Sequence, residues 1–348
     1  MGLGLLVGLA ADRVGTKRSL CAGLVLLGLS SIAGAWARDG TSLLILRGLE
    51  GCGLLLATLP APALIRRLVP SGRLKAVLGW WGAYMPMGVA CGLLAGPWVI
   101  GGLGWQAWWL GLGALSLLSA LGVGLAVAAE PPGPGPGRLA ATGRHGRLRQ
   151  TLVAPGPWLI ALSFAAYSAQ WLAVIGFLPT VYAQAGIGGA VAGALTALAA
   201  AANVLGNVAA GRLLARGMRP ALLQAIGFAG MAVASTAAFA ELGGLALPAA
   251  GRYAAVVLFS ALGGLVPATL FSLVLAVAPS EQTVSTTVGW AQQWSSFGQF
   301  AGPPVVAWIA GHAGGWQWTW VATAGCSGLG MALAALLARR MRARAAIS

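Results

Sequence analysis

The sequence predicts an all-α polytopic membrane protein, and three observations support this fold class. Hydrophobic residues make up 58% of the chain and charged residues only 8%, whereas soluble domains carry about 25% charged residues. No charged residue occurs between Lys75 and Glu130, between Arg149 and Arg212, or between Glu281 and Arg339. Each gap is long enough for two spanning helices of roughly 20 residues. Helices are expected because backbone groups facing lipid must be paired internally, and no long alternating barrel pattern is present.

The formal net charge of +15 does not indicate a nucleic-acid-binding protein, because the basic residues lie in separated loops rather than on one surface. These loops alternate with nearly uncharged ones, so the positive-inside rule predicts that they are cytoplasmic. One exception is the loop 279–283, which the order of helices places inside although its only charge is Glu281. The basic loops contain Arg13, Lys17 and Arg18; Arg66, Arg67, Arg73 and Lys75; Arg138, Arg144, Arg147 and Arg149; Arg212, Arg216 and Arg219; and Arg339, Arg340, Arg342 and Arg344.

Hydropathy predicts ten full spans, with boundaries soft by a few residues. They lie at about residues 19–37, 42–65, 76–99, 106–128, 157–181, 190–211, 220–240, 250–278, 284–310 and 317–338. Residues 1–11 are too short to cross, since at 1.5 Å per residue they cover roughly half of a 30 Å core. Either the chain begins inside a helix or its start codon has been placed too late. Kinks are expected at Pro86, Pro179, Pro267 and Pro303-Pro304.

A segment rich in proline, glycine and arginine divides the chain. Residues 130–156 contain Pro131-Pro-Gly-Pro-Gly-Pro-Gly and several arginines, a composition that cannot build a core or enter lipid. We therefore expect an incomplete N-terminal bundle at 1–129, a cytoplasmic linker at 130–156 and a six-helix C-terminal bundle at 157–348. Cys21, Cys52, Cys91 and Cys326 all fall in apolar segments and are expected to be small buried thiols, with no disulfide or metal spacing.

Short matches at a nearly constant offset indicate an internal repeat. They occur in the same order in both halves, each at the same place in its helix hairpin. We expect two pseudo-symmetric six-helix bundles related by a parallel repeat, the first lacking its first helix and part of its second. The matched pairs are Arg47 with Arg252, Pro70-Ser71 with Pro279-Ser280, Gly79-Trp80 with Gly289-Trp290, Gly96-Pro97 with Gly302-Pro303, and Gly104-Trp105-Gln106 with Gly315-Trp316-Gln317.

A charged turn near the start carries the strongest motif, Gly8-x-x-x-Asp12-Arg13-x-Gly15-x-Lys17-Arg18. It resembles the signature of the major facilitator superfamily of secondary transporters, and a degenerate copy without the acid follows at 206–217. Arg47-Gly-Leu-Glu50-Gly51-Cys-Gly53 resembles that family's fourth-helix motif. The run 92–102 resembles the fifth-helix motif of its antiporters, with a final spacing one residue longer. The runs 62–67 and 177–180 resemble the bacterial cyanate and nitroimidazole transporter group.

The resemblance implies that the charged turn is a gating loop, formed by Gly8, Asp12, Arg13, Gly15, Lys17 and Arg18, that holds the two halves in the outward-open state. The alternative is a turn whose charges only set topology. Arg47 and Glu50 lie at i, i+3 in a predicted span, where each charge costs of order 2.5–3.5 kcal/mol and so usually faces the protein interior. Glu50 is a candidate proton carrier and Arg47 a candidate anion ligand. A structural salt bridge near the helix end remains the alternative.

Uncharged aromatic and amide residues are the other candidates for the solute site. Amides in lipid are unfavourable unless they hydrogen-bond inward, and stripes of these residues recur at equivalent places in the two halves. Each stripe could instead be core packing or an interfacial aromatic belt. The candidates are Tyr84 on the fifth helix of the repeat, Tyr167, Gln170 and Trp171 on the seventh, Asn203 and Asn207 on the eighth, and Gln293 and Trp294 on the eleventh.

The leading interpretation is alternating-access transport of a small organic solute across a bacterial inner membrane, with proton coupling through Glu50. The cargo is either an anion held by Arg47 or a lipophilic molecule in a tryptophan-rich cavity. A non-transporting sensor or a defective truncated remnant is the main alternative. A membrane-embedded enzyme is disfavoured because six acids and two isolated histidines do not cluster. The partners expected are the bilayer, the solute and protons, with no nucleic acid; we expect a monomer without cofactor or metal, and a cytoplasmic linker and C-terminus.

Overall fold

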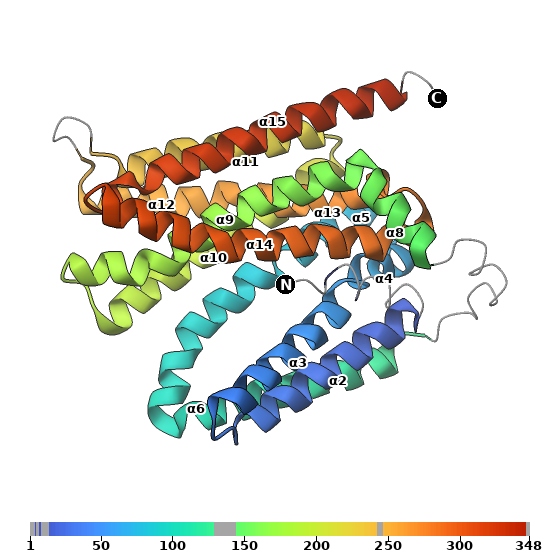
Figure 1. Cartoon of the computed structure of the whole chain (residues 1–348), viewed down its shortest axis with the longest axis horizontal. Coiled ribbons are helices and arrows are strands. Elements are labelled where there is room, and N and C mark those ends of the chain that lie inside the picture. Colours follow the sequence, from blue (N-terminus) through green and yellow to red (C-terminus); the bar gives the residue numbers. More distant parts are fainter. Residues whose placement is uncertain (1–3, 5–6, 8–13, 129–143, 242–245, 346–348) are drawn as a thin grey trace. The chain divides into compact units, whose positions relative to one another are not determined.

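The computed structural model describes residues 4, 7, 14–128, 144–241 and 246–345. Gly8, Asp12 and Arg13 of the predicted gating loop lie outside these residues, as do residues 131–137 of the linker. Every regular element of the described residues is a helix (Figure 1). This confirms the all-α prediction.

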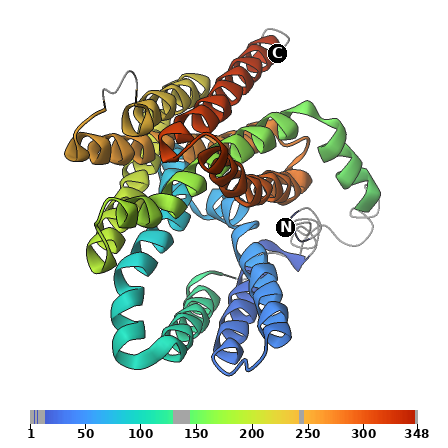
Figure 2. The same cartoon turned by 60° about the vertical axis from the view of Figure 1, so that its left-hand side comes forward.

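Packing divides the chain into two compact units. The first comprises Met1–Val69, Ala95–Ala154 and Ala278–Gln293. Its helices are α2 (Thr16–Gly34), α3 (Gly40–Thr58), α4 (Ala61–Leu68), most of α6 (Tyr84–Ala126), α8 (Arg144–Val153), η1 (Glu281–Thr283) and the start of α14 (Val284–His312). Within this unit α2 and α3 run side by side (Figures 1 and 2).

The second unit comprises Pro70–Leu94, Pro155–Val277 and Trp294–Ser348. It contains the first residues of α6, the rest of α14, and the helices α5 (Ser71–Gly82), α9 (Pro155–Gln184), α10 (Gly189–Ala215), α11 (Pro220–Phe239), α12 (Ala249–Gly263), α13 (Leu265–Val277), η2 (Trp316–Trp318) and α15 (Thr319–Ala345). Because these units follow packing and not the sequence repeat, the predicted division at residues 130–156 stays a prediction.

Each predicted span is helical in the structure, with outer ends that differ by a few residues, but three of the ten are covered by two consecutive helices. Eight helical segments of the described part are long and apolar enough to cross a membrane. One of them, Ser71–Ala126, turns at Gly104 and so supplies two of the predicted spans. The helix α14 is not among the eight, because amides and hydroxyl side chains interrupt its apolar sequence.

Proline breaks three of the predicted helices. The interruptions at Leu59, Ala83 and Gly264 each lie three residues before a proline, namely Pro62, Pro86 and Pro267. Proline lacks the amide hydrogen that would bond to the preceding turn, and its ring clashes with the carbonyl there. The expected kinks at Pro86 and Pro267 are therefore breaks, whereas Pro179 and Pro303-Pro304 lie inside continuous helices.

Close helix contacts in the second unit depend on glycine, which has no side chain to separate the two backbones. A Cβ atom on Gly206 of α10 would lie 1.9 Å from the carbonyl oxygen of Ala261, and one on Gly264 would lie 2.1 Å from that of Asn203. Since lipid provides no hydrophobic drive for helix association, dispersion contacts between closely approaching backbones hold such helices together. The α10–α12 crossing therefore requires glycine at both positions.

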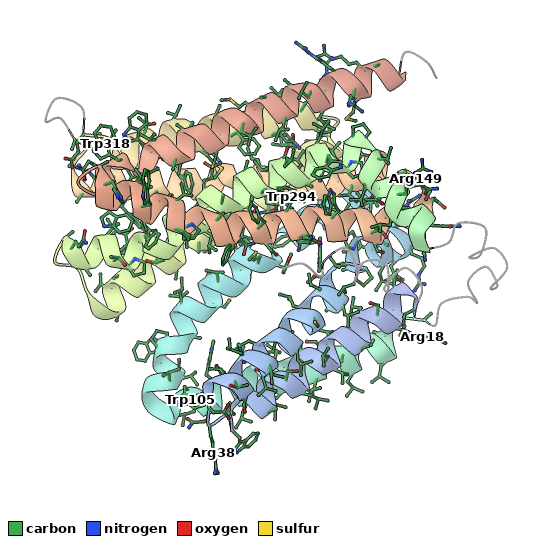
Figure 3. All side chains as sticks on the ribbon, viewed as in Figure 1. Arg18, Arg38, Trp105, Arg149, Trp294 and Trp318 are labelled. Atoms are coloured by element: carbon green, nitrogen blue, oxygen red, sulfur yellow. The ribbon has the colours of Figure 1, made fainter. Side chains whose placement is uncertain are left out.

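The repeated Gly-Trp-Gln motif forms the same kind of turn in both halves. Gly104 has φ 84° and ψ 163°, and Gly315 has φ 142° and ψ 179°, a region that L side chains rarely adopt. In each copy the side-chain oxygen of the following glutamine lies where a Cβ would project, 3.2 Å away for Gln106 and 2.3 Å for Gln317. Figure 3 places Trp105 at the bend of α6. The shared geometry supports the repeat inferred from the sequence.

Two local expectations need correction. Part of the linker is helical, since α8 covers Arg144–Val153, and Arg147 in it is buried. Arginine, leucine and glutamine are good helix formers, so the segment has the propensity for this. The cysteines were expected to be buried, but Cys91 is exposed and the other three are only partly buried, because the helix faces that carry them are incompletely covered by protein.

Candidate functional site

A network of uncharged polar side chains lies in the interior of the second unit. The Tyr167 hydroxyl of α9 donates to Asn203 Oδ1 of α10 at 3.2 Å. Asn207, one turn further along α10, donates from Nδ2 to the same oxygen at 2.9 Å. Asn203 Nδ2 in turn donates to the Ser260 carbonyl of α12 at 2.7 Å. Both asparagines are fully buried, and the network pairs all of their side-chain polar atoms except Asn207 Oδ1.

The hydroxyl of Ser260 extends this network to Trp171, and a separate pair of serine hydroxyls joins α9 to α14. The indole nitrogen of Trp171 donates to the Ser260 hydroxyl at 3.1 Å. On the neighbouring face of α9, the Ser168 hydroxyl contacts that of Ser295 at 3.0 Å, and Gln299 Nε2 donates to Ser295 at 3.2 Å. Ser260 thus connects α12 to α9, and Ser168 and Ser295 connect α9 to α14.

A small cavity of about 30 Å³ adjoins these groups. No charged residue lines it, so a bound molecule would meet aromatic faces, a thioether, hydroxyls and one amide. An apolar wall with a few polar groups is the usual composition of a small-molecule site. At about 30 Å³ the cavity has room for about one water molecule, so a larger solute would require its walls to move apart. The lining residues are Gly82, Tyr84, Met85, Pro86, Phe164, Tyr167, Ser168, Trp171, Pro267, Phe271, Ser295 and Gln299.

The asparagine network faces α5 at Gly82. The Oδ1 atom of Asn207 is buried and has no hydrogen-bond partner. A Cβ on Gly82 would lie only 2.5 Å from this oxygen. Gly82 therefore leaves the space that the amide occupies. Close by in sequence, Trp81 and Tyr84 stack with ring centroids 4.9 Å apart, which fixes the ring of Tyr84 at the edge of the cavity.

Arg47 and Glu50 form a charged cluster in the first unit. The Arg47 guanidinium bonds to the Glu50 carboxylate, and its carbon lies 4.1 Å from the centroid of the Trp109 ring. Glu50 is the more buried partner, with a side chain 14% exposed against 40% for Arg47. The pair expected at i, i+3 is therefore present on α3, and Arg47 also packs against Trp109 of α6.

The other amide and aromatic candidates lie outside the cavity. Gln170 faces α15, where its Oε1 accepts from the Ser327 hydroxyl at 3.0 Å. Trp294 packs with ring centroids 5.6 Å from Trp158 and 5.7 Å from Phe297. Gln293 precedes it at the end of the first unit and is partly buried. The structure therefore brings together Tyr84, Tyr167, Trp171, Asn203 and Asn207, but not Gln170.

The described part of the predicted gating loop contacts the end of α6. Gly15 has φ 95° and precedes the first residue of α2. The Lys17 ammonium donates to the carbonyl oxygens of Gly124, at 2.8 Å, and Val127. A cation at the C-terminal end of a helix satisfies free carbonyls and interacts favourably with the helix dipole. Arg18 is exposed and Figure 3 shows it at the opposite end of α2 from Arg38.

The sequence reasoning missed Ser168, Ser260, Ser295 and Gln299. Ser295 and Gln299 lie one turn apart on α14, so their shared face was a readable signal. The described residues contain no group of three or more His, Cys, Asp or Glu side chains that could hold a metal ion.

Comparison with known proteins identifies the family. A model of the Major Facilitator Superfamily matches residues 2–294. The puromycin resistance protein pur8 of Streptomyces alboniger is 39% identical over 124 residues, which is 35% of this chain and 24% of that protein. The chain thus matches only about a quarter of the length of this relative.

Solved transporter structures show the same fold at low sequence identity. The FucP transporter in its outward conformation is 16% identical with a TM-score of 0.77, covering 97% of this chain and 86% of that one. The proton:xylose symporter XylE is 17% identical with a TM-score of 0.73, covering 97% and 82%. The human organic anion transporter MFSD10 is 17% identical with a TM-score of 0.69, covering 96% and 80%. The chain therefore belongs to the Major Facilitator Superfamily and has the helical, multi-span fold of its transporters.

Proposed function

We propose that this protein is a secondary active transporter that carries a small, neutral organic solute across the membrane by alternating access. The observation that carries this proposal is the uncharged cavity of the second unit, joined to a buried network of Tyr167, Asn203 and Asn207. Aromatic faces at Tyr84 and Trp171 offer stacking to a planar solute. The hydroxyls and the Gln299 amide offer hydrogen bonds that orient it.

The charge of the cavity lining distinguishes the two kinds of cargo that the sequence left open, an anion and a lipophilic molecule. An anion needs a cation in its site, and the cavity has none. Arg47 lies in the first unit and its guanidinium is already engaged by Glu50 and Trp109. Puromycin, named in the relative from Streptomyces alboniger, has an aromatic body, hydrogen-bonding groups and an amine that is neutral when deprotonated. A neutral or weakly polar aromatic solute is therefore the cargo that fits best.

Proton coupling is assigned to the Arg47–Glu50 pair. Glu50 is the acid of α3, inside an apolar segment of the chain, where neutralisation by protonation removes the cost of a charge in lipid. Its loss of charge would release Arg47, which would then remain held over Trp109 by the cation–π contact. The pair thus has two arrangements that a proton gradient can bias.

We further propose a bacterial inner-membrane location, a cytoplasmic linker and C-terminus, and a monomer. The basic loops support this orientation. The Arg66 guanidinium, in one of these loops, bonds to Glu281 at 2.7 Å, so the weakly charged loop 279–283 lies beside a basic one in the first unit. The charged turn around Lys17 is assigned the gating role, with its ammonium on the end of α6.

The test uses the full-length protein in proteoliposomes, with puromycin as the first probe. The proposal expects saturable, pH-gradient-driven uptake that falls at least several-fold in Trp171→Ala. The matched control is Trp308→Ala, since Trp308 is exposed and lines no part of the cavity. Equal uptake by both variants would remove the cavity from the solute path. If no compound in a panel of small organic solutes is taken up saturably, the non-transporting alternative is favoured.

A further inference from the structure

The second unit contains another, larger cavity that the proposed transport cycle does not use. It has a volume of about 420 Å³, against about 30 Å³ for the candidate solute cavity. It lies at the ends of α9 and α11 and the starts of α10 and α12, beside η2, the element of Trp318 in Figure 3. None of its lining residues is shared with the candidate solute cavity.

The walls of this cavity are mainly apolar. Leu178 and Val181 come from α9, Leu195 from α10, Phe239 from α11 and Val256 from α12. Trp316 closes one side and packs on Phe177 with ring centroids 4.7 Å apart. Cavities of roughly 300–1,000 Å³ with apolar and aromatic walls are typical of small-molecule sites. The volume and composition therefore suit a compact lipophilic molecule.

One hydrogen-bonding group in the wall is unused. The Tyr182 hydroxyl of α9 is buried and has no hydrogen-bond partner. By contrast, the Tyr253 hydroxyl in the same wall donates to the Leu195 carbonyl at 3.2 Å. A buried donor without an acceptor is unfavourable. A ligand with an acceptor oxygen at this point would satisfy it.

The only cation in the wall is already compensated. Arg252 bonds through Nη2 to Glu241 Oε1 at 2.7 Å and through Nε to the Leu247 carbonyl at 3.1 Å. With its charge paired, the cavity offers no advantage to an anion and disfavours a second cation. The remaining recognition is apolar contact and the Tyr182 donor, which together select a neutral molecule.

We propose that this cavity is a second binding site, which takes a small neutral lipophilic molecule whose carbonyl or ether oxygen accepts the hydrogen bond of Tyr182. Its position at one end of the bundle makes it a site separate from the solute cavity. An acyl chain or other pure hydrocarbon would fill the volume but leave Tyr182 unpaired, so preference for an oxygen acceptor is the distinguishing property.

The experiment is photolabelling of the full-length protein in nanodiscs with benzophenone, a neutral aromatic ketone. Mass spectrometry of the labelled peptides should show saturable labelling within residues 178–195 and 249–256. Competition then compares fluorenone with fluorene, which differs by lacking the carbonyl oxygen. We expect fluorenone to compete about 3- to 10-fold better, the range for one net hydrogen bond.

Two tyrosine variants separate recognition from packing. In Tyr182→Phe the advantage of fluorenone over fluorene should disappear, whereas Tyr253→Phe, which removes a hydroxyl already bonded within the protein, should keep it. Ala250→Trp, at an exposed position on the cavity rim, should abolish the saturable labelling by filling the space. Equal competition by both compounds in the unmodified protein would overturn the proposal, as would saturable labelling confined to other helices.

Discussion

At the scale of single residues, burial and pairing separate the polar side chains into two groups. Asn203 and Tyr167 are tied into a network inside the second unit, whereas Glu50 of the first unit is paired with a cation on its own helix. The first group is suited to recognition of a solute, because its members hold their positions by mutual bonds. The second is suited to a change of protonation, because a carboxylate can gain a proton.

Glu50→Gln should abolish the dependence of uptake on the pH gradient. Glutamine keeps the size of the side chain and a hydrogen-bond acceptor for Arg47 but cannot gain or lose a proton. Uptake of puromycin into proteoliposomes, with and without an imposed pH gradient, measures the effect. Asp39→Asn, at the exposed start of α3, is the matched control and should retain coupling. Full gradient dependence in Glu50→Gln would exclude Glu50 as the proton carrier.

Asn203→Ala should destabilise the protein by about 1–3 kcal/mol, because it leaves Tyr167 without its acceptor and removes one of the two donors to the Ser260 carbonyl, which keeps the Gly264 amide. Thermal unfolding of the detergent-solubilised protein, followed by size-exclusion chromatography, checks this. Tyr167→Phe removes a single donor and should cost less, since Asn203 Oδ1 still accepts from Asn207. The reverse order of the two variants would mean that the network does not hold α9, α10 and α12 together.

At the scale of elements, glycines allow two features of the fold: the close crossing of two helices and the reversal of the chain within α6. The α10–α12 crossing needs Gly206, where an added Cβ has no room. The α6 bend needs Gly104 for another reason, because its positive φ is unfavourable for any L side chain. One constraint is steric and lies between helices, and the other is conformational and lies within the chain.

Gly206→Ala should lower stability by about 1–3 kcal/mol through overpacking, seen as a lower unfolding temperature in detergent. Gly176→Ala, on α9 with open space around the added methyl group, is the control and should be neutral or slightly stabilising, since alanine is the better helix former. Equal unfolding temperatures for the two variants would show that α10 and α12 can move apart without loss of stability.

Gly104→Ala should cost about 1–3 kcal/mol as backbone strain. Gly102→Ala, two residues earlier in the same helix and also in open space, has no positive φ and should leave stability unchanged. The same unfolding measurement distinguishes them. A neutral Gly104→Ala would mean that the chain can reverse here with another backbone conformation.

The ends of the spans were predictable because hydropathy and charge set them. Helix breaks and buried polar contacts were harder to predict, because they depend on single residues. Long apolar runs separated by arginines gave the spans. The break at Leu59 was missed because Pro62 was read only as part of a motif. The serines of the candidate site were missed because serine in a helix can bond to its own backbone, as Ser168 does to the Phe164 carbonyl, and so carries no clear signal. The asparagines were found because an amide in an apolar helix needs a partner.

At the scale of the whole molecule, the basic loops predict which side of the membrane each connection faces. The two ends of α10 give a direct test, because Gly188 precedes it and Arg216 follows it, and both are exposed. In a cysteine-free background, a membrane-impermeant maleimide should label Gly188→Cys in intact cells and label Arg216→Cys only after permeabilisation. The opposite pattern would invert the proposed orientation.

The matching turns at Gly104 and Gly315 suggest why an internal repeat can still be recognised in the sequence. A surface that faces lipid accepts many apolar side chains, so two copies of one hairpin drift apart quickly there. A reversal that only glycine can make without strain, with a glutamine folded over the vacant side, tolerates far fewer replacements. Ancestry in such proteins is therefore best sought at the tips of the hairpins, where backbone geometry limits the choice of residue, and not along the spans themselves.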